Sequence, residues 1–323
     1  MNAQAIRIHN SPPPANLRPF DMRRDLLSVA DLVELCFASS LDADGRLYVR
    51  QMRQAARGGP LLDLAAAGPG PMSGYVWQEN GKVVGNLSLI PHGYGNRKIM
   101  LIANVAVHPE QRRRGIARAL TEAALDNLLT NGKDEIWLQV DENNPAAVTL
   151  YRNMGFVERT RRTSWRVYPQ IGAGSTPAAK TKVRKRHTSD WARQSAWLQS
   201  TYPRDLRWQI PLDPVLLQPG WRGSVERALS TRQVRQWSAE EGGELLAALS
   251  WQSSTLDADR LWLAAAKENE GKGIAALMRQ IHNTMKPTRK LALNYPARRA
   301  EDALRAAGFK SARTLIWMEY PKD

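Results

Sequence analysis

The chain has 323 residues, of which 43% are hydrophobic and 24% charged, a composition typical of globular proteins and a length that allows two domains. No run of about 18 apolar residues suggests a membrane span, and the polar start lacks an apolar signal core, so we expect a cytoplasmic protein. A single cysteine, Cys36, excludes an internal disulfide and a cysteine-rich metal site, and we expect no metal. The net charge of +15 suits a polyanionic ligand, an acidic protein or nucleic acid. Because no RNA-binding signature or zinc-finger spacing accompanies the basic residues, nucleic acid is disfavoured as a partner.

The sequence contains an internal repeat, so that its two halves resemble each other. Residues 168–181 are rich in Gly, Pro, Ala and Ser, which is typical of a connector, and we predict domains at 1–170 and 182–323 joined by a linker at 171–181. Four pairs of segments match in the same order: Leu17–Val33 with Val183–Arg193, Gly85–Ser88 with Leu246–Ser250, Arg114–Leu120 with Lys272–Met278, and Asn153–Phe156 with Ala306–Phe309. A repeat of about 150 to 160 residues indicates duplication of a domain.

The segment from Ile99 to Val107 is apolar apart from Asn104 and rich in β-branched residues, which predicts a strand buried on both faces. His108-Pro109 ends it. An amphipathic helix follows, with one apolar face formed by Ile116, Leu120, Ala123, Ala124 and Leu128. The helix is predicted to stop near Asn131-Gly132.

Between this strand and helix lies the basic segment Gln111-Arg112-Arg113-Arg114-Gly115-Ile116-Ala117. A helix N-terminus offers unpaired N–H groups and a partial positive charge, and the small residues let an anion approach the backbone. Arginine adds fork-shaped donors that suit phosphate oxygens. Taken alone, such a segment is more often a solvated basic turn. Its context favours an anion site.

That context is a second strand and helix. Glu135–Asp141 is predicted to form a strand, Asn144 is a favourable N-cap, and Pro145 suits the first helical position. The helix is predicted to run to Gly155, a residue typical of the position just past a helix end.

These residues resemble the GCN5-related N-acetyltransferases (GNAT family), whose cofactor motif Q/R-x-x-G-x-G/A is followed by N-x-x-A-x-x-x-Y-x-x-x-G-F. Arg112–Ala117 matches the first motif and Asn144–Phe156 the second. The resemblance implies an α/β (α+β) fold with two tandem GNAT-like domains, each a mixed, mostly antiparallel sheet flanked by helices. It also implies acetyl-CoA as cosubstrate and an amine acceptor.

The resemblance assigns roles to individual residues. The backbone of the splayed strand at Val105, Ala106 and Val107 is implied to pair with the pantetheine arm and to polarise the thioester. Asn144 approaches the pantetheine or the sulfur, and Tyr151 is the general acid that protonates the leaving thiolate. The residues implied to hold the pyrophosphate are Arg112, Arg113, Arg114, Gly115, Ile116, Ala117 and Arg118.

The general base is left open. Gln139 stands where relatives that modify protein N-termini often have a glutamate, and an amide cannot act as a base. Asp141 or Glu142 could act through water, although carboxylates at strand ends usually face solvent. The second copy has Glu270 in place of Arg112 and Leu304 in place of Tyr151, so we predict a catalytically silent C-terminal domain.

The predicted function is transfer of an acetyl group from acetyl-CoA to a primary amine of a small molecule or peptide by direct attack on the thioester. The alternatives are a non-catalytic CoA-sensing or nucleic-acid-binding protein on the same fold, and an acyltransferase that uses a longer acyl-CoA. The sequence does not identify the acceptor, which we expect to bind near residues 36–75. It allows a monomer or a homodimer, with no membrane partner.

Overall fold

The computed structural model describes residues 14–38, 41, 43–58, 73–132, 135–168, 180–285 and 289–321, and it forms two compact units. Unit 1 comprises residues 1–160 and 315–323, and unit 2 comprises residues 161–314. The boundary falls inside strands β6 (Val157–Val167) and β12 (Lys310–Tyr320), so each strand contributes residues to both units. Residues 169–179, which include most of the predicted linker, lie outside the described residues. The predicted domain ends at 170 and 182 therefore stay a prediction.

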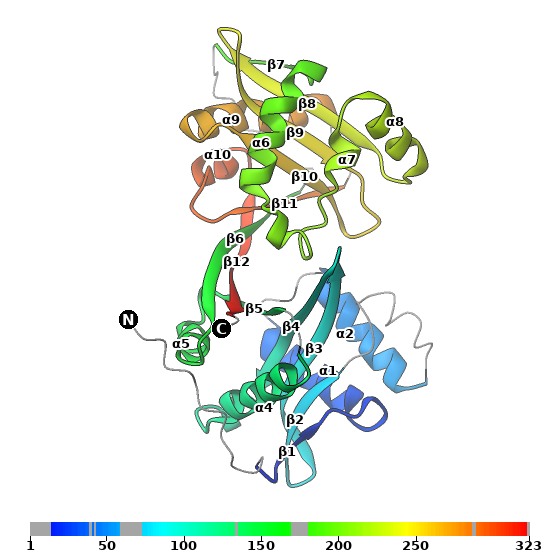
Figure 1. The fold of residues 1–323 in the computed structure, drawn as a ribbon, viewed down its shortest axis with the longest axis vertical. Helices are drawn as coiled ribbons and strands as arrows, with labels where there is room; N and C mark the ends of the chain where they lie inside the picture. Colours follow the sequence, from blue (N-terminus) through cyan, green and yellow to red (C-terminus); the bar gives the residue numbers. More distant parts are fainter. Residues whose placement is uncertain are drawn as a thin grey trace. The chain divides into compact units, whose positions relative to one another are not determined.

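Unit 1 is a mixed sheet with helices on both faces (Figure 1). The sheet order is β1-β2-β3-β4-β5-β12, and every pair is antiparallel except β4 with β5. Helices α1 and α2 pack on one face around Val76, while α4 packs on the other around Leu87. In chain order the elements before β6 are β1 (Leu17–Pro19), α1 (Met22–Phe37), α2 (Ala43–Ala56), β2 (Ser73–Glu79), β3 (Lys82–Tyr94), β4 (Arg97–Val107), the 3₁₀ turn η1 (Pro109–Gln111), α4 (Ile116–Thr130), β5 (Glu135–Asp141) and α5 (Pro145–Asn153).

Unit 2 repeats this plan. Its sheet order is β6-β11-β10-β9-β8-β7, with one parallel pair, β10 with β11. The elements are β7 (Lys182–Lys185), η2 (Thr188–Asp190), α6 (Trp191–Thr201), η3 (Arg204–Leu206), α7 (Pro214–Leu217), α8 (Gly220–Leu229), β8 (Val234–Glu241), β9 (Glu244–Gln252), β10 (Ala258–Ala265), η4 (Lys267–Asn269), α9 (Glu270–Met285), β11 (Lys290–Pro296) and α10 (Glu301–Ala306). The predicted fold class, two tandem mixed and mostly antiparallel α/β units, is confirmed.

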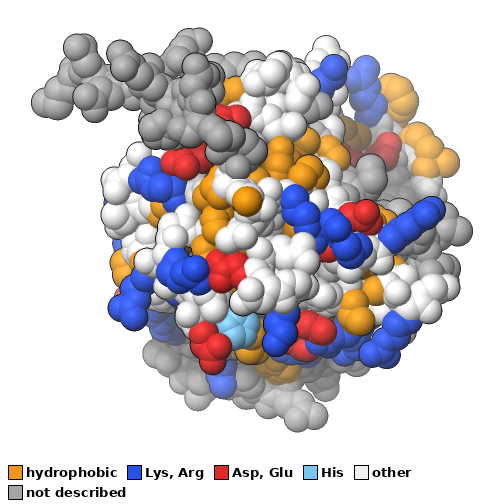
Figure 2. Space-filling model, turned by 90° about the horizontal axis from the view of Figure 1, so that it is seen from below, with side chains coloured by type: hydrophobic (Ala, Val, Ile, Leu, Met, Phe, Trp, Pro, Cys, Tyr) orange, Lys and Arg blue, Asp and Glu red, His pale blue; other side chains and the backbone are white. Residues whose placement is uncertain are grey.

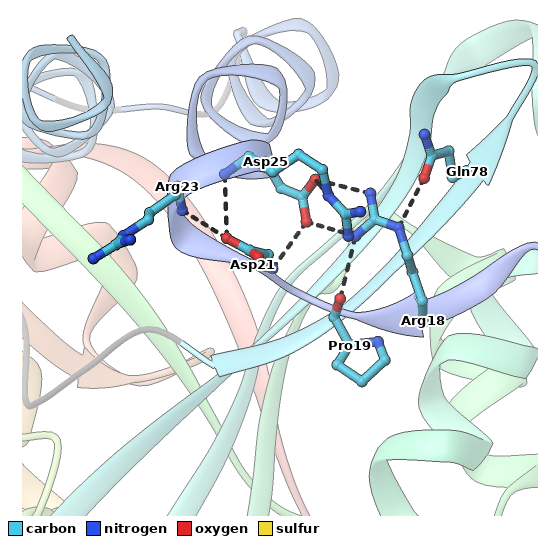
Figure 3. A network of polar contacts seen from close by, with 7 residues as sticks. Arg18, Pro19, Asp21, Arg23, Asp25 and Gln78 are labelled. Carbon is cyan, nitrogen blue, oxygen red and sulfur yellow. Dashed lines mark hydrogen bonds and ion pairs between the residues drawn. The ribbon is translucent and has the colours of Figure 1, made fainter.

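The internal repeat extends to a polar network at the start of each unit. In unit 1, the Arg18 guanidinium donates two hydrogen bonds, of 2.6 and 2.8 Å, to the buried carboxylate of Asp25, and its Nε donates to Gln78 (Figure 3). In unit 2, Arg184 bonds Asp190 at 2.7 and 2.9 Å in the same two-pronged way. The first matched pair of segments thus forms the same charged contact in both units, which supports duplication.

In each unit, one strand beside the parallel pair is contributed by the other half of the sequence. In unit 1, β12 at the end of the chain pairs with β5, with Ile316 opposite Val140. The β12 side chains of Ile316 and Met318 are buried in the core of unit 1. In unit 2, β6 pairs with β11 in the equivalent place, with Trp165 opposite Leu293. The core of unit 1 is thus completed by the last residues of the chain.

Two observations concern the surface. Within the described residues, no helix has the length and apolar character needed to cross a membrane. On the face drawn in Figure 2, Lys and Arg side chains are scattered and interspersed with Asp and Glu, and they do not gather in one basic patch.

Candidate active site

Strands β4 and β5 run together only at their beginnings and then part. The last pair between them joins Ile102 to Leu138. Beyond it, β4 continues against β3 and β5 continues against β12. A bulge marks the point of separation, because the β3–β4 register shifts there and Asn104 adopts a positive φ of 49°. The edges of β4 and β5 that face each other after this point are not paired with one another.

The bulge is held by a side chain from the neighbouring strand. Asn86, on β3, is buried and donates a hydrogen bond of 3.0 Å to the backbone carbonyl of Asn104. The side chains of Val105 and Val107 pack against the core, and Ala106 is buried. Any ligand laid along this part of β4 therefore meets backbone groups.

Where β4 ends, the chain forms an open, uncapped helix N-terminus. Gly115 is the N-cap of α4 with φ 78°, and no side chain caps the helix. The first helical hydrogen bond runs from the Ala119 N–H to the Gly115 carbonyl, so the N–H groups of residues 116–118 have no acceptor within the helix. A Cβ placed on Gly115 would meet nothing within 4 Å, which shows that this backbone is accessible. These features suit an anion.

The four arginines around the start of α4 differ in their partners. Arg112 donates to the Val107 carbonyl at 3.2 Å, and Arg118 pairs with Glu122 at 3.1 Å. Arg114 forms a two-pronged ion pair with Glu79, at 2.9 and 3.0 Å. Among the described residues Arg113 has no ion pair, and its backbone has a positive φ of 63°. Arg113 is therefore the guanidinium most available to an incoming anion.

One neighbour of the loop, Glu79, was not singled out from the sequence. Glu79 lies at the end of β2 and holds Arg114, and no local sequence signal links the two residues. The Cys36 thiol donates to the Val107 carbonyl at 3.3 Å, and burial raises its pKa.

Asn144 and Tyr151 lie on α5, which follows β5. Asn144 caps the helix, and its Oδ1 accepts a 3.1 Å hydrogen bond from the Ala147 N–H. Tyr151 is only 6% exposed and lies edge-on to Phe156, with ring centroids 5.9 Å apart. Its hydroxyl forms no hydrogen bond with any described residue, and burial raises its pKa above the ordinary value near 10. The phenol is therefore fully protonated at neutral pH, as a proton donor must be.

The candidate bases lie on and just after β5. Asp141 Oδ1 accepts a hydrogen bond of 2.9 Å from the Asn143 N–H and closes the turn after the strand. Glu142 lies in that same turn. Gln139 behaves differently, because its side-chain Nε2 is buried and has no hydrogen-bond partner among the described residues.

In unit 2, strands β10 and β11 also separate, but side chains of unit 2 itself form hydrogen bonds to the separated strands. Strands β10 and β11 pair only as far as Leu261 with Leu293. Beyond that point the Leu263 N–H donates to the hydroxyl of the fully buried Tyr202, at 3.3 Å. Arg162, which is 1% exposed, donates to the Asn294 carbonyl at 3.1 Å and to the Thr201 carbonyl at 2.9 Å. Burial lowers the pKa of Arg162 to about 10.

The position equivalent to Arg112 is also closed in unit 2. Glu270 is buried at the start of α9, accepts a hydrogen bond from the Tyr295 hydroxyl and pairs with Arg299 at 2.7 Å. Leu304, which stands in place of Tyr151, is fully buried. In unit 2, the Leu263 N–H, the Asn294 carbonyl and the carboxylate of Glu270 are thus all bonded within the protein.

Comparison with known proteins identifies the domain that holds the open site. Residues 35–156 match the model of the Acetyltransferase (GNAT) family. This domain belongs to the GNAT family. The match covers the splayed strand β4, the arginine-rich loop and the helix that carries Tyr151.

Individual relatives match over limited segments. The ribosomal-protein alanine N-acetyltransferase of Salmonella typhimurium is 44% identical over 66 residues, which cover 20% of this chain and 43% of that protein. A mycothiol acetyltransferase of Kocuria rhizophila is 29% identical over 161 residues, 48% of this chain and 50% of the relative. The matches to these curated relatives thus span half of their length or less. A GNAT structure from Sphaerobacter thermophilus aligns with 95% of this chain and 96% of its own at 14% identity and a TM-score of 0.54, a likeness of fold alone.

Proposed function

We propose that unit 1 transfers an acetyl group from acetyl-CoA to a primary amine of a small molecule or peptide. The observation that carries the proposal is the parting of β4 and β5 after Ile102 and Leu138, with an uncapped helix N-terminus where β4 ends. Unpaired strand edges suit an amide-containing chain, and an open helix N-terminus suits a diphosphate. These are the two polar parts of coenzyme A.

The residues present fit this cosubstrate. The N–H groups of residues 116–118 and the free Arg113 guanidinium are proposed to bind the pyrophosphate, with Arg112, Arg114 and Arg118 adding positive charge around it. The backbone of Val105, Ala106 and Val107 is proposed to bind the pantetheine arm. Bound acetyl-CoA supplies a thioester that an amine can attack.

Tyr151 is proposed as the general acid. Its protonated hydroxyl, which no described residue engages, donates its proton to the departing sulfur. Asn144 helps to place α5, since its side chain caps that helix. Its side-chain NH₂ group, which the cap does not use, is proposed to donate to the bound arm.

Unit 2 is proposed to be catalytically silent. The Leu263 N–H is bonded to Tyr202, the carboxylate of Glu270 stands in place of a phosphate-binding arginine, and Leu304 has no proton to donate. A buried carboxylate opposes the binding of an anion. Absence of a metal, the cytoplasmic location and the oligomeric state stay predictions.

The names of the relatives guide the choice of acceptors. One acts on an alanine of a ribosomal protein and another is named for mycothiol, so both a peptide and a small molecule belong in the test. Thiol release from acetyl-CoA is measured with peptides, amino acids, polyamines and aminoglycosides. We expect release with at least one of these amines.

Substitution of Tyr151 tests the assigned chemistry. Tyr151→Phe is expected to lower the rate of transfer by about 100-fold or more, because general acid catalysis is lost. The midpoint of thermal unfolding should hardly change, since the hydroxyl makes no hydrogen bond to the described protein. Tyr75→Phe, which changes a partly buried tyrosine packed against the same core, is the matched control and should keep the wild-type rate. A wild-type rate in Tyr151→Phe would remove Tyr151 from this role.

A further inference from the structure

Gln139 has a buried side-chain amide nitrogen to which no described residue forms a hydrogen bond. It is the first residue of β5 beyond the last pair with β4, and its Nε2 is buried without a hydrogen-bond partner among the described residues. On its other side β5 is paired, with Trp317 of β12 directly opposite Gln139. Buried amides in folded proteins are nearly always hydrogen-bonded, so an unpaired one calls for a ligand or another explanation.

Gln139 lies at the narrow end of the parted strands. The separation begins after Ile102 and continues along residues 103–107 to the loop at Arg112. At about 3.3 Å per residue, these five positions span roughly 16 Å. A linear ligand whose diphosphate lies at the loop therefore directs its opposite end toward Gln139. This step rests on the proposed function, which places coenzyme A here.

Tyr151 and Gln139 approach this end from opposite faces of the sheet. Leu138 and Val140 lie in the same core cluster as Tyr151. Because side chains alternate along a strand, Gln139 between them projects to the other face. Tyr151 and the Gln139 amide therefore lie on opposite faces of the sheet.

Unit 2 shows what happens when the equivalent residue needs no ligand. Asn294 is the first residue of β11 beyond its last pair with β10, which corresponds to Gln139 in unit 1. Its side-chain oxygen accepts a hydrogen bond from the Arg162 Nε. An amide side chain is present at both positions, and among the described residues only the Asn294 side chain has a hydrogen-bond partner.

We propose that the Gln139 side-chain amide donates a hydrogen bond to the carbonyl oxygen of the acetyl thioester. An amide N–H suits a carbonyl oxygen, whereas a carboxylate at this position would present only acceptors. Gln139 is then a substrate-binding residue that distinguishes acetyl-CoA from free CoA. A glutamine at this position can therefore contribute to substrate binding, although it cannot act as a base as a glutamate could.

The test is calorimetric binding of acetyl-CoA and of CoA to the full chain, for wild type and Gln139→Met. One neutral hydrogen bond corresponds to a factor of about 3 to 10 in affinity. Wild type is expected to bind acetyl-CoA tighter than CoA by this factor. Gln139→Met should bind both with the affinity of wild type for CoA, and its unfolding temperature should be equal or higher because an unpaired buried amide is removed.

Gln252→Met is the matched control. Gln252 is also a buried glutamine with an unpaired Nε2, but its Oε1 accepts a 2.8 Å hydrogen bond from Trp262 in unit 2. This variant should unfold at a lower temperature and keep the preference for acetyl-CoA.

Each result separates the two proposals. Equal affinity of the wild-type protein for both ligands, or a preference that survives in Gln139→Met, overturns the role of Gln139 and leaves the cosubstrate in place. Loss of CoA binding together with a lower unfolding temperature in Gln139→Met marks a structural residue and also overturns it. A wild-type protein that binds neither ligand overturns the proposed function.

Discussion

Tyr151 combines burial with a hydroxyl that no described residue engages. Burial raises its pKa, so the folded state favours the protonated phenol. The folded pKa lies above the unfolded value near 10, and the stability gained from burying Tyr151 is therefore present below pH 10 and lost as pH rises through the folded pKa. Below pH 10 the hydroxyl keeps its proton.

Two features determine the expected pH dependence of the rate. Tyr151 stays protonated below pH 10, and Gln139 stands where a carboxylate could have acted as a base. The rate constant kcat/KM should rise with pH until it reaches the pKa of the acceptor amine, near 7.7–8.0 for an α-amine and about 10.4 for an alkyl amine. Ionisation of Tyr151 should cause no decline below pH 10. Profiles measured from pH 6 to 10 with one acceptor of each class test this. A rising limb with the same midpoint for both acceptors would instead indicate a base on the protein.

At the scale of elements, the paired network of Arg18 with Asp25 and of Arg184 with Asp190 anchors the first helix of each unit. Burial alone would raise the pKa of either carboxyl, but hydrogen bonds from the arginine and from the backbone outweigh it and lower both values. A lowered folded pKa stabilises the protein above the unfolded value near 3.9, and this contribution is lost as pH falls.

Asp25→Asn should therefore destabilise the protein at pH 7 by about 3 kcal/mol, because the Arg18 guanidinium loses its anionic partner. Asp190→Asn should have a similar effect, since the repeated pair has the same geometry. Urea unfolding at pH 7 and pH 3 gives the comparison. The loss should shrink at pH 3, and an equal loss at both pH values would contradict the account.

The exchanged strand β12 makes unit 1 depend on the end of the chain. Met318→Ala, at a fully buried position in the core of unit 1, should destabilise the protein by about 2–5 kcal/mol. Hydrogen exchange in α4 and β5 should become faster, because these elements share that core. Arg313→Ala, at an exposed position of the same strand, is the control. Unchanged exchange in α4 and β5 of Met318→Ala would separate β12 from the unit 1 core.

Elements with strong local signals were predictable, and the long-range pairings were not. The strand Glu135–Asp141 and the cap at Asn144 match the structure because periodicity and capping are local properties. The pairing of β12 with β5 joins residues far apart in sequence, and neither strand has a local sequence pattern that identifies the strand with which it pairs. The same holds for Glu79 with Arg114 and for the unpaired amide of Gln139. Residues 59–72, which belong to the segment near which we expect the acceptor to bind, lie outside the described residues.

At the scale of the whole chain, the two units share one fold but differ at the position of the candidate site. The ion pair between Arg114 and Glu79 recurs in unit 2 between Lys272 and Glu241. The scaffold around the loop is therefore retained. What differs is the interior, because in unit 2 the Tyr202 hydroxyl accepts a hydrogen bond from the Leu263 N–H and Glu270 pairs with Arg299. Duplication followed by closure of one copy accounts for both the repeat and its divergence.

The central claim is that acetyl-CoA binds once per chain, along β4 and the N-terminus of α4. Amide hydrogen exchange of the full chain, with and without acetyl-CoA, tests it directly, because backbone N–H groups that bind the ligand become protected. We predict slower exchange in residues 103–118 on addition of acetyl-CoA and no change in residues 262–275. Unchanged exchange in residues 103–118, or equal protection of both segments, would contradict the account.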